Sequence, residues 1–205
     1  VQLSVMYLLA FELAYAKGAI SKEKCMELTA ELQKVPDKIQ DILVLKERCQ
    51  FIASRLVNAE SLLYIGRGLD YALSMEGSLK LKEISYIHSE SYAAGELKHG
   101  TISLIEDGTL VTAVVTQEEL YKKTISNIVE VKSRGAKIIL VCTDACAREL
   151  KDGVADYVVE IPHTEELLMP ITAVVPLQLL AYYTSINRGN DPDKPRNLAK
   201  SVTVE

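Results

Sequence analysis

Three charged residues of one segment have the types and the spacing that proton transfer needs. Glu76, Lys80 and Glu83 lie within MEGSLKLKEIS, at positions i, i+4 and i+7, which share one face of a helix. A carboxylate placed there serves as a general base, and the neighbouring ammonium group stabilises negative charge or changes the carboxylate pKa. The same spacing is also typical of a row of surface salt bridges. The spacing alone leaves both interpretations open.

A histidine and a glycine turn are further candidates. His99 follows Gly95-Glu96 in a predicted loop or single turn, where an imidazole titrates near neutrality or merely caps the turn. Gly66-Arg67-Gly68 follows an apolar run and either cradles an anion at the next helix N-terminus or forms a tight corner. It matches neither common phosphate-binding motif. His88 and His163 have no acid or base beside them in the sequence, and we assign them structural roles.

Alternating apolar runs and helical segments predict the fold that positions these residues. The chain has 205 residues, 48% of them hydrophobic, which is enough for one domain with its own core. Buried strands are predicted at 61–66, 110–116, 137–143 and 157–161, with helices at 72–90, 118–133 and 165–186. Such runs are typical of a parallel sheet covered on both faces. We expect an α/β, three-layer, flavodoxin-like sandwich.

The chain divides into three parts. Residues 1–58 are predicted to be helical: an amphipathic helix with apolar residues from Leu3 to Ala14, a second helix that stops before Pro36, and a third from Asp37 to about Asn58. Residues 59–189 are predicted to form the α/β domain. Residues 190–205 are predicted to form an irregular polar tail, because Pro192 and Pro195 cannot continue a helix.

Composition argues against several classes of protein. The formal net charge is −5, and Lys122-Lys123 is among the few basic pairs, so a nucleic-acid surface is not expected. The longest apolar segment, 167–183, contains Pro170 and Pro176, which we expect to break a membrane-spanning helix. The four cysteines lack zinc-site spacing, so we expect reduced thiols in a cytoplasmic protein, with no metal and no cofactor.

Two long blocks carry a resemblance to a known family. MEGSLKLKEISYIHSESYAAGELKHGTISLI, at 75–105, and PLQLLAYYTSINRGNDPDKPRNLAKSVTVE, at 176–205, closely resemble the isomerase region of glutamine:fructose-6-phosphate amidotransferases, the glucosamine-6-phosphate synthases. That region consists of two sugar-isomerase (SIS) lobes, and this chain is similar to the second lobe with the helices that precede it. The resemblance implies conversion of fructose 6-phosphate and glutamine-derived ammonia to glucosamine 6-phosphate, an early step towards UDP-GlcNAc.

The resemblance also implies a role for each matching residue. Glu83 resembles the base that moves a proton between C1 and C2 of the open-chain sugar, and Lys80 resembles its helper. His99 resembles the residue that opens the sugar ring and reaches the site from a partner subunit, which implies a homodimer. Lys200 resembles the tail lysine at the C2 carbonyl, with Ala199 beside the sugar. Glu76 matches a supporting position in substrate binding.

Some parts of the family's machinery are not expected within these residues. The family's glutaminase domain, which begins with cysteine, and its Ser/Thr-rich phosphate loops of the SQSGET type do not occur in the sequence. A glutaminase domain in the parent chain is therefore an implied partner. Two alternatives stay open: a related SIS isomerase or deaminase that does not use glutamine, and a module that senses sugar phosphates without turning them over. The ELKHG and NLAKSVTVE motifs favour the synthase.

Overall fold

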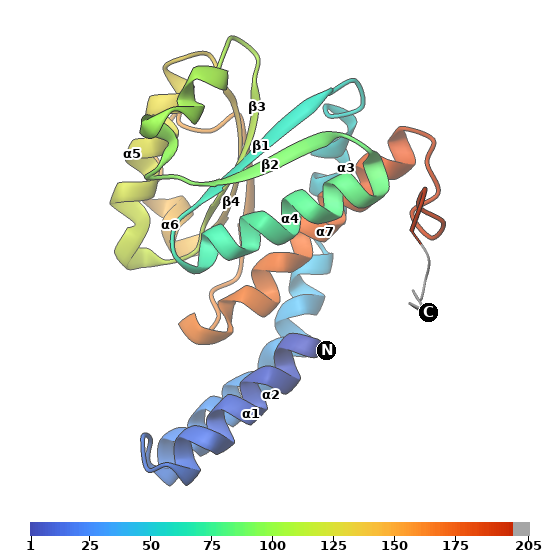
Figure 1. Cartoon of the computed structure of the whole chain (residues 1–205). Helices are drawn as coiled ribbons and strands as arrows, with labels where there is room; N and C mark the ends of the chain where they lie inside the picture. The colour runs from blue at the N-terminus through green and yellow to red at the C-terminus, as the bar shows by residue number, and fades with distance from the viewer. Residues whose placement is uncertain (199–205) are drawn as a thin grey trace.

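A parallel sheet of five strands forms the centre of this computed structural model, which describes residues 1–198 (Figure 1). The strands are β1 (Ser61–Gly66), β2 (His88–Ala93), β3 (Leu110–Val115), β4 (Lys137–Thr143) and β5 (Tyr157–Ile161). Their order across the sheet is β2-β1-β3-β4-β5, and every neighbouring pair is parallel. This is the flavodoxin-like order, so the predicted fold class is confirmed.

Helices cover both faces of the sheet and make the three layers. The helices are α1 (Gln2–Ala16), α2 (Lys22–Leu43), α3 (Lys46–Ser54), α4 (Leu69–Ser85), α5 (Tyr121–Lys132), α6 (Asp144–Arg148) and α7 (Met169–Asn187), with short 3-10 turns at Leu97–His99, Thr101–Leu104, Glu118–Leu120 and Glu166–Leu168. One apolar core joins α3, α4 and α7 to the sheet, and a second joins α5 and α6 to its other face. The strands are therefore buried on both sides, which explains their almost continuous apolar sequences.

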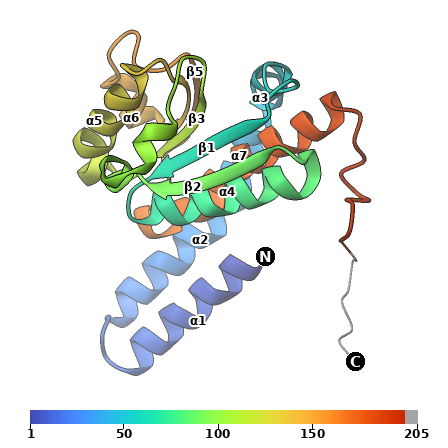
Figure 2. The ribbon, with the colours of Figure 1, turned by 45° about the horizontal axis from the view of Figure 1, so that its top comes forward.

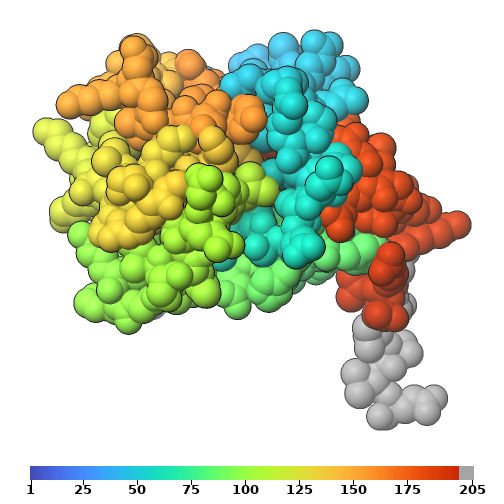
Figure 3. Space-filling view, turned by 90° about the horizontal axis from the view of Figure 1, so that it is seen from above, coloured from blue at the N-terminus to red at the C-terminus, as the bar shows by residue number. Residues whose placement is uncertain are grey.

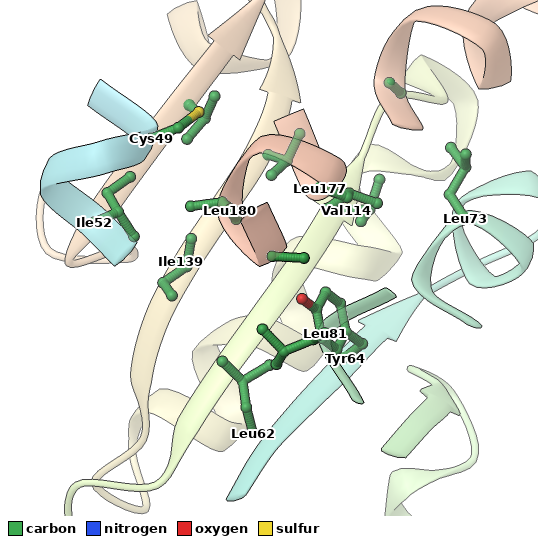
Figure 4. Close-up of a cluster of buried hydrophobic side chains, with 14 of the residues drawn as sticks. Cys49, Ile52, Leu62, Tyr64, Leu73, Leu81, Val114, Ile139, Leu177 and Leu180 are labelled. Carbon is green, nitrogen blue, oxygen red and sulfur yellow. The ribbon is translucent and has the colours of Figure 1, made fainter. Parts of the chain in front are cut away.

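Alternate residues of each strand face the two cores. Leu62 and Tyr64 of β1 belong to the core under α4 and α7, where Figure 4 shows them beside Leu81, whereas Leu63 and Ile65 face the core under α5. This alternation is the two-residue period of a β-strand. The strand predictions at 61–66, 137–143 and 157–161 match the structure, and β3 ends one residue earlier than predicted.

Small residues let α4 lie close to the sheet and to α7. A Cβ added at Gly77 would lie 2.9 Å from Cε1 of Tyr64 and 3.1 Å from Cδ1 of Leu177. Ser74 and Ser78 are buried on the same face of α4. Because real Cβ contacts are rarely so short, a larger residue at position 77 would push α4 outward. The close packing fixes the rotation of α4 about its own axis, and with it the direction of its charged face.

The first two helices form an antiparallel hairpin that projects from the α/β body (Figures 1 and 2). The helix predicted at the start of the chain is present, but its apolar residues Leu3, Met6 and Leu9 are exposed, while Phe11 is the buried residue of α1. Packing against α2, and not the spacing of the most apolar residues, decides which side of α1 is buried.

One proline that is expected to end a helix, Pro36, lies inside α2, and Pro176 lies inside a helix that the sequence predicts at 165–186. α2 continues through Pro36 to Leu43, and α7 continues through Pro176, while Pro170 occupies the first turn of α7. Each internal proline removes one backbone hydrogen bond, but both helices are held by neighbours: Val35 and Ile42 are buried in α2, and Leu177 and Leu180 in α7. Packing here outweighs the local preference.

The last helix is apolar because it is a core helix. Residues 166–187 are long enough and apolar enough to cross a membrane, but 61% of the most apolar part is buried inside the protein. α7 packs against α3 and α4 under the sheet. Its hydropathy is therefore explained by burial in the protein core.

The helix that carries the charged row ends earlier than predicted. α4 stops at Ser85, and His88–Ala93 form β2 at the edge of the sheet. The sequence HSESYA is polar because an edge strand has a neighbour on one side only, and His88 is exposed. Its backbone pairs in parallel with β1, from Ser61 opposite His88 to Gly66 opposite Ala93. The sequence does not predict this strand, because it lacks the apolar run of the others.

A buried carboxylate ties the start of α4 to the end of β3. Asp70 is 1% exposed, and it accepts hydrogen bonds from the backbone amide of Thr116 at 2.9 Å and from the Thr116 hydroxyl. Burial raises the pKa of the Asp70 carboxyl above its usual value, although the bonds from Thr116 oppose this shift. The folded protein therefore keeps the Asp70 proton to a higher pH than the unfolded chain does.

Replacement of Asp70 by alanine is expected to lower the free energy of unfolding by about 1–3 kcal/mol, because the buried donors of Thr116 lose their acceptor. Asp70→Asn keeps one acceptor and should cost less. Because the folded pKa is raised, the Asp70 contribution to stability falls as pH rises from the ordinary aspartate pKa to the raised one. Urea denaturation at several pH values between the ordinary and the raised pKa measures both the loss of stability in the variants and its pH dependence. Equal pH dependence in the wild type and Asp70→Asn would contradict the assignment.

Candidate functional site

The charged row on α4 forms a linked set of side chains. Nζ of Lys80 donates to Oε2 of Glu83 at 2.7 Å and lies 3.7 Å from Oε1 of Glu76. The side chains are 42% exposed at Glu76, 32% at Lys80 and 29% at Glu83. All three therefore point away from the packed face of α4, and a ligand can reach them. The structure brings together the three residues that the helical spacing predicted.

The two carboxylates hold Lys80 in its charged form. The hydrogen bond to Glu83 is the largest cause that raises the pKa of Lys80 above its usual value, and the charge of Glu76 adds to it. Lys80 is therefore an ammonium group at neutral pH. A fixed cation within hydrogen-bond distance of a carboxylate can stabilise an oxyanion that forms while the carboxylate accepts a proton.

Lys80 and Glu83 of the charged row lie toward the amino edge of the sheet. Strand β1 ends at Gly66, α4 begins at Leu69 beside that carboxyl edge, and the helix then runs back to Ser85. β2 begins at His88, which is opposite the first residue of β1. Lys80 and Glu83, in the last turns of α4, are therefore at the end of the sheet where β1 and β2 start.

His99 lies at the opposite edge. It follows the end of β2, where Ala93 is opposite Gly66, the last residue of β1. A strand of this length spans about 16 Å, so the structure does not bring His99 of one chain to Glu83 of the same chain. Leu97 is buried and Nζ of Lys98 lies 3.1 Å from Glu130, whereas the His99 side chain is 76% exposed. The turn is anchored, and it presents His99 to the outside.

The segment after α7 returns to the end of α4. Nδ2 of Asn190 donates to the Ser85 carbonyl at 3.4 Å, and the backbone amide of Arg196 donates to Oη of Tyr86 at 2.9 Å. Figure 3 shows this red segment at one side of the molecule, against the green surface of the neighbouring elements. The two predicted site residues of the tail, Ala199 and Lys200, lie outside the described residues.

The glycine turn at 66–68 forms a tight corner. Nε2 of Gln117 donates to the Arg67 carbonyl at 2.7 Å, and a Cβ on Gly68 would lie 2.8 Å from Oε1 of Gln117. Arg67 donates from Nη2 to Oδ1 of Asn127 at 2.9 Å. The Gln117 side chain thus fills the space in which an anion would bind. Of the two interpretations of this turn, the structure favours the corner.

A groove beside the charged row is largely apolar. It has a volume of about 660 Å³ and is lined by residues of α1, α2, α4 and α7, with Glu76 among them, but Lys80 and Glu83 do not line it. Met75 and Leu79, next to the charged row, are 46% and 43% exposed. The described residues therefore supply reactive side chains on an open face and do not enclose a sugar by themselves.

Two residues near the charged row were not predicted. Tyr86 ends α4 in the left-handed region, at φ 62°, and the guanidinium of Arg196 stacks on its ring at 4.3 Å. The sequence gives little sign of this contact, because the residues are 110 positions apart. A weak signal was available: the tail is polar but carries two prolines, which limit the conformations of a loop.

Comparison with known proteins supports the resemblance. The model of the SIS domain family matches residues 55–188. Proteins named glutamine–fructose-6-phosphate aminotransferase (isomerizing) are 54% identical in Caldanaerobacter subterraneus and 49% identical in Thermococcus kodakarensis, in each case over 100% of this chain. The chain spans about a third of the length of these curated relatives, 33% of each.

Solved structures agree with the family match. The C-terminal domain of glucosamine-fructose-6-phosphate aminotransferase from Francisella tularensis superposes with a TM-score of 0.87 at 35% identity, over 91% of this chain and 52% of that one. A glucosamine-6-phosphate deaminase from Thermotoga maritima shares the fold, with a TM-score of 0.65 at 23% identity, over 99% of this chain and 56% of that one. The sheet order, the matched residues and these similarities lead to one conclusion: the chain belongs to the SIS domain family.

Proposed function

We propose that this chain is the second SIS lobe and catalytic tail of a glutamine–fructose-6-phosphate aminotransferase, which makes glucosamine 6-phosphate from fructose 6-phosphate and glutamine-derived ammonia. The observation that carries the proposal is the Lys80–Glu83 pair, 2.7 Å apart on an open face of α4, beside the point to which the tail returns. The identity of 54% over the whole chain to a protein of that name supports the same activity.

The proposed chemistry gives each residue a separate step. Ammonia condenses with the C2 carbonyl to an imine and water is lost, with Lys200 engaging C2. Glu83 takes a proton from C1 and returns it to C2, and the proton of the C1 hydroxyl moves to the imine nitrogen, so that C1 becomes the aldehyde carbon and C2 carries the amine of glucosamine 6-phosphate. Lys80, as an ammonium group, offsets negative charge near the C1 oxygen. Glu76 supports Lys80 from 3.7 Å, and Ala199 lines the sugar.

We propose a homodimer in which His99 acts in the site of the partner subunit and opens the sugar ring. The support is geometric: His99 and Glu83 of one chain lie at opposite edges of the sheet, and the turn that holds His99 is anchored while its side chain is exposed. The proposed division of the chain is 1–58, 59–189 and 190–205, in a cytoplasmic protein whose parent chain carries a glutaminase domain.

The test of the proposed function supplies fructose 6-phosphate and ammonium to the natural polypeptide that contains this sequence. Mass spectrometry then identifies the product. Glucosamine 6-phosphate is the expected product. Glucose 6-phosphate alone would replace the proposal by an isomerase that does not use ammonia, and ligand binding without turnover would replace it by a sugar-phosphate sensor.

Replacement of Lys200 by alanine is expected to lower kcat by roughly 100-fold, because a group that stabilises charge in the transition state usually contributes about this factor. The matched control is Lys194→Ala in the same tail, since Lys194 is exposed and, among residues 1–198, its hydrogen bond is that of its backbone amide to Asp191. Steady-state kinetics with ammonium as the nitrogen source compares kcat of the Lys200→Ala and Lys194→Ala variants. Equal rates in both variants would remove Lys200 from the proposed site.

A further inference from the structure

The loop from Asn190 to Arg196 is held at both ends by residues at the end of α4. Asn190 donates to the Ser85 carbonyl, and six positions later the Arg196 amide donates to the hydroxyl of the next residue, Tyr86. The Arg196 guanidinium also stacks on the Tyr86 ring, with its central carbon 4.3 Å from the ring centroid. Tyr86 therefore contacts Arg196 at two points, one through the backbone and one through the side chain.

Other contacts of this loop are few within the described residues. In 191–198, the hydrogen bonds shown are those of a turn at Asp191, to the amides of Asp193 and Lys194, and the bond to Tyr86. Arg196, Asn197 and Leu198 are exposed, so apolar burial does not hold this part of the chain. The path of the chain just before position 199 depends on the contact with Tyr86.

Tyr86 occupies an unusual backbone conformation for its size. Its φ is 62°, in the left-handed region, and its amide closes the helix by donating to the Lys82 carbonyl at 3.3 Å. Helices commonly end in this conformation, but with glycine or asparagine at that position. A bulky residue there is strained, and such strain is common at functional sites. The tyrosine lies three positions after Glu83 in the sequence.

We propose that Tyr86 is a positioning residue, which holds the segment that leads to Lys200 at the end of the helix that carries Glu83. The proposal rests on the proposed function, and it adds a residue that acts through the tail and not on the sugar. Lys200 follows Arg196 by four positions, and four residues reach at most about 14 Å. The contact of Arg196 with Tyr86 therefore fixes the point at which the segment that leads to position 200 begins.

The first measurement is independent of activity. Trypsin cleaves after arginine, and cleavage of the Arg196–Asn197 bond requires Arg196 to leave the Tyr86 ring. In the natural polypeptide, Tyr86→Gly removes the ring and the hydroxyl but suits the left-handed backbone, so the helix end is kept. The cleavage rate, followed by mass spectrometry, is expected to rise roughly tenfold, from the loss of one hydrogen bond and one cation–π contact.

The second measurement is turnover of fructose 6-phosphate with ammonium. Tyr86→Gly is expected to lower kcat roughly tenfold while KM for the sugar changes much less, because the lost contact orders the tail and does not bind substrate. Tyr86→Phe keeps the ring and should recover part of both effects. The matched control is Arg55→Met, which removes a similar stack, that of Arg55 on Phe51 at 5.0 Å, away from the tail.

The outcomes separate the two proposals. If the cleavage rate is unchanged in Tyr86→Gly, the contact between Tyr86 and Arg196 does not hold the tail. Faster cleavage with unchanged kcat would overturn the positioning role. If the wild type makes no glucosamine 6-phosphate, the proposed function fails, whereas the cleavage rates still decide whether Tyr86 holds the tail.

Discussion

Replacement of Glu83 by glutamine is expected to slow the formation of glucosamine 6-phosphate by roughly 100- to 10,000-fold, the usual contribution of a general base. Glutamine has nearly the same shape and keeps an oxygen that can accept a hydrogen bond from Nζ of Lys80. In the wild type, Nζ lies 2.7 Å from Oε2 of Glu83. Glutamine cannot take up the C1 proton. The change therefore removes the proposed chemical step and leaves the packing of α4 in place.

The Glu83→Gln variant tests the role of Glu83 as a base, because it leaves Lys80 charged. The pKa of Lys80 is raised mainly by its hydrogen bond to Glu83, so removal of that carboxylate lets it fall towards the ordinary lysine value. An ordinary lysine, with a pKa of about 10.4, is still charged at neutral pH. A large loss of kcat in Glu83→Gln is thus assigned to the missing base.

A second ion pair of the chain provides the control. Glu31 and Lys34 on α2 are also three positions apart, in the reverse order, with 2.6 Å between Nζ and Oε1. Glu31→Gln removes an equivalent surface pair, and it should leave turnover and stability nearly unchanged. Steady-state kinetics and urea denaturation compare the two variants. Near-normal turnover of Glu83→Gln would refute the role of Glu83.

The sequence predicts well those elements whose burial is uniform. β4 is buried on both faces, so KIILVCT shows an apolar run with the correct ends. Glu76, Lys80 and Glu83 are predicted on one face because a regular helix relates them. The polar edge strand β2 is missed, since HSESYA has neither an apolar run nor a clear alternation. Pro36 is misjudged because α2 is held by packing against residues that are distant in the sequence.

The arrangement of the candidate site depends on topology more than on local pattern. No spacing rule places His99 at the carboxyl edge and Glu83 at the amino edge, because that follows from the parallel pairing of β2 with β1. Likewise, the contact between Arg196 and Tyr86 joins residues 110 positions apart. The hydrogen bond between Asp70 and Thr116 also joins residues that are distant in the sequence, 46 positions apart. Local sequence gives the reactive groups, and the strand order determines which of them meet.

If each site takes Glu83 from one subunit and His99 from the other, two inactive variants should restore activity when they are mixed. Glu83→Gln and His99→Ala are each expected to lose most turnover. In a mixed dimer, one site combines the Glu83 of the second variant with the His99 of the first and is intact, whereas the other site lacks both groups. Random exchange of subunits makes half of the dimers mixed, so about a quarter of wild-type activity should return.

A mixture of Glu83→Gln with Lys200→Ala is the matched control. The tail returns to α4 of its own chain through Arg196 and Tyr86, so Glu83 and Lys200 of one subunit are expected to serve one site. Each site of that mixed dimer then lacks one of the two groups, and no activity should return. Light scattering verifies that the dimers exist, and differently tagged subunits verify the exchange. Exchanged dimers of Glu83→Gln and His99→Ala that stay inactive would show that His99 does not act across the interface.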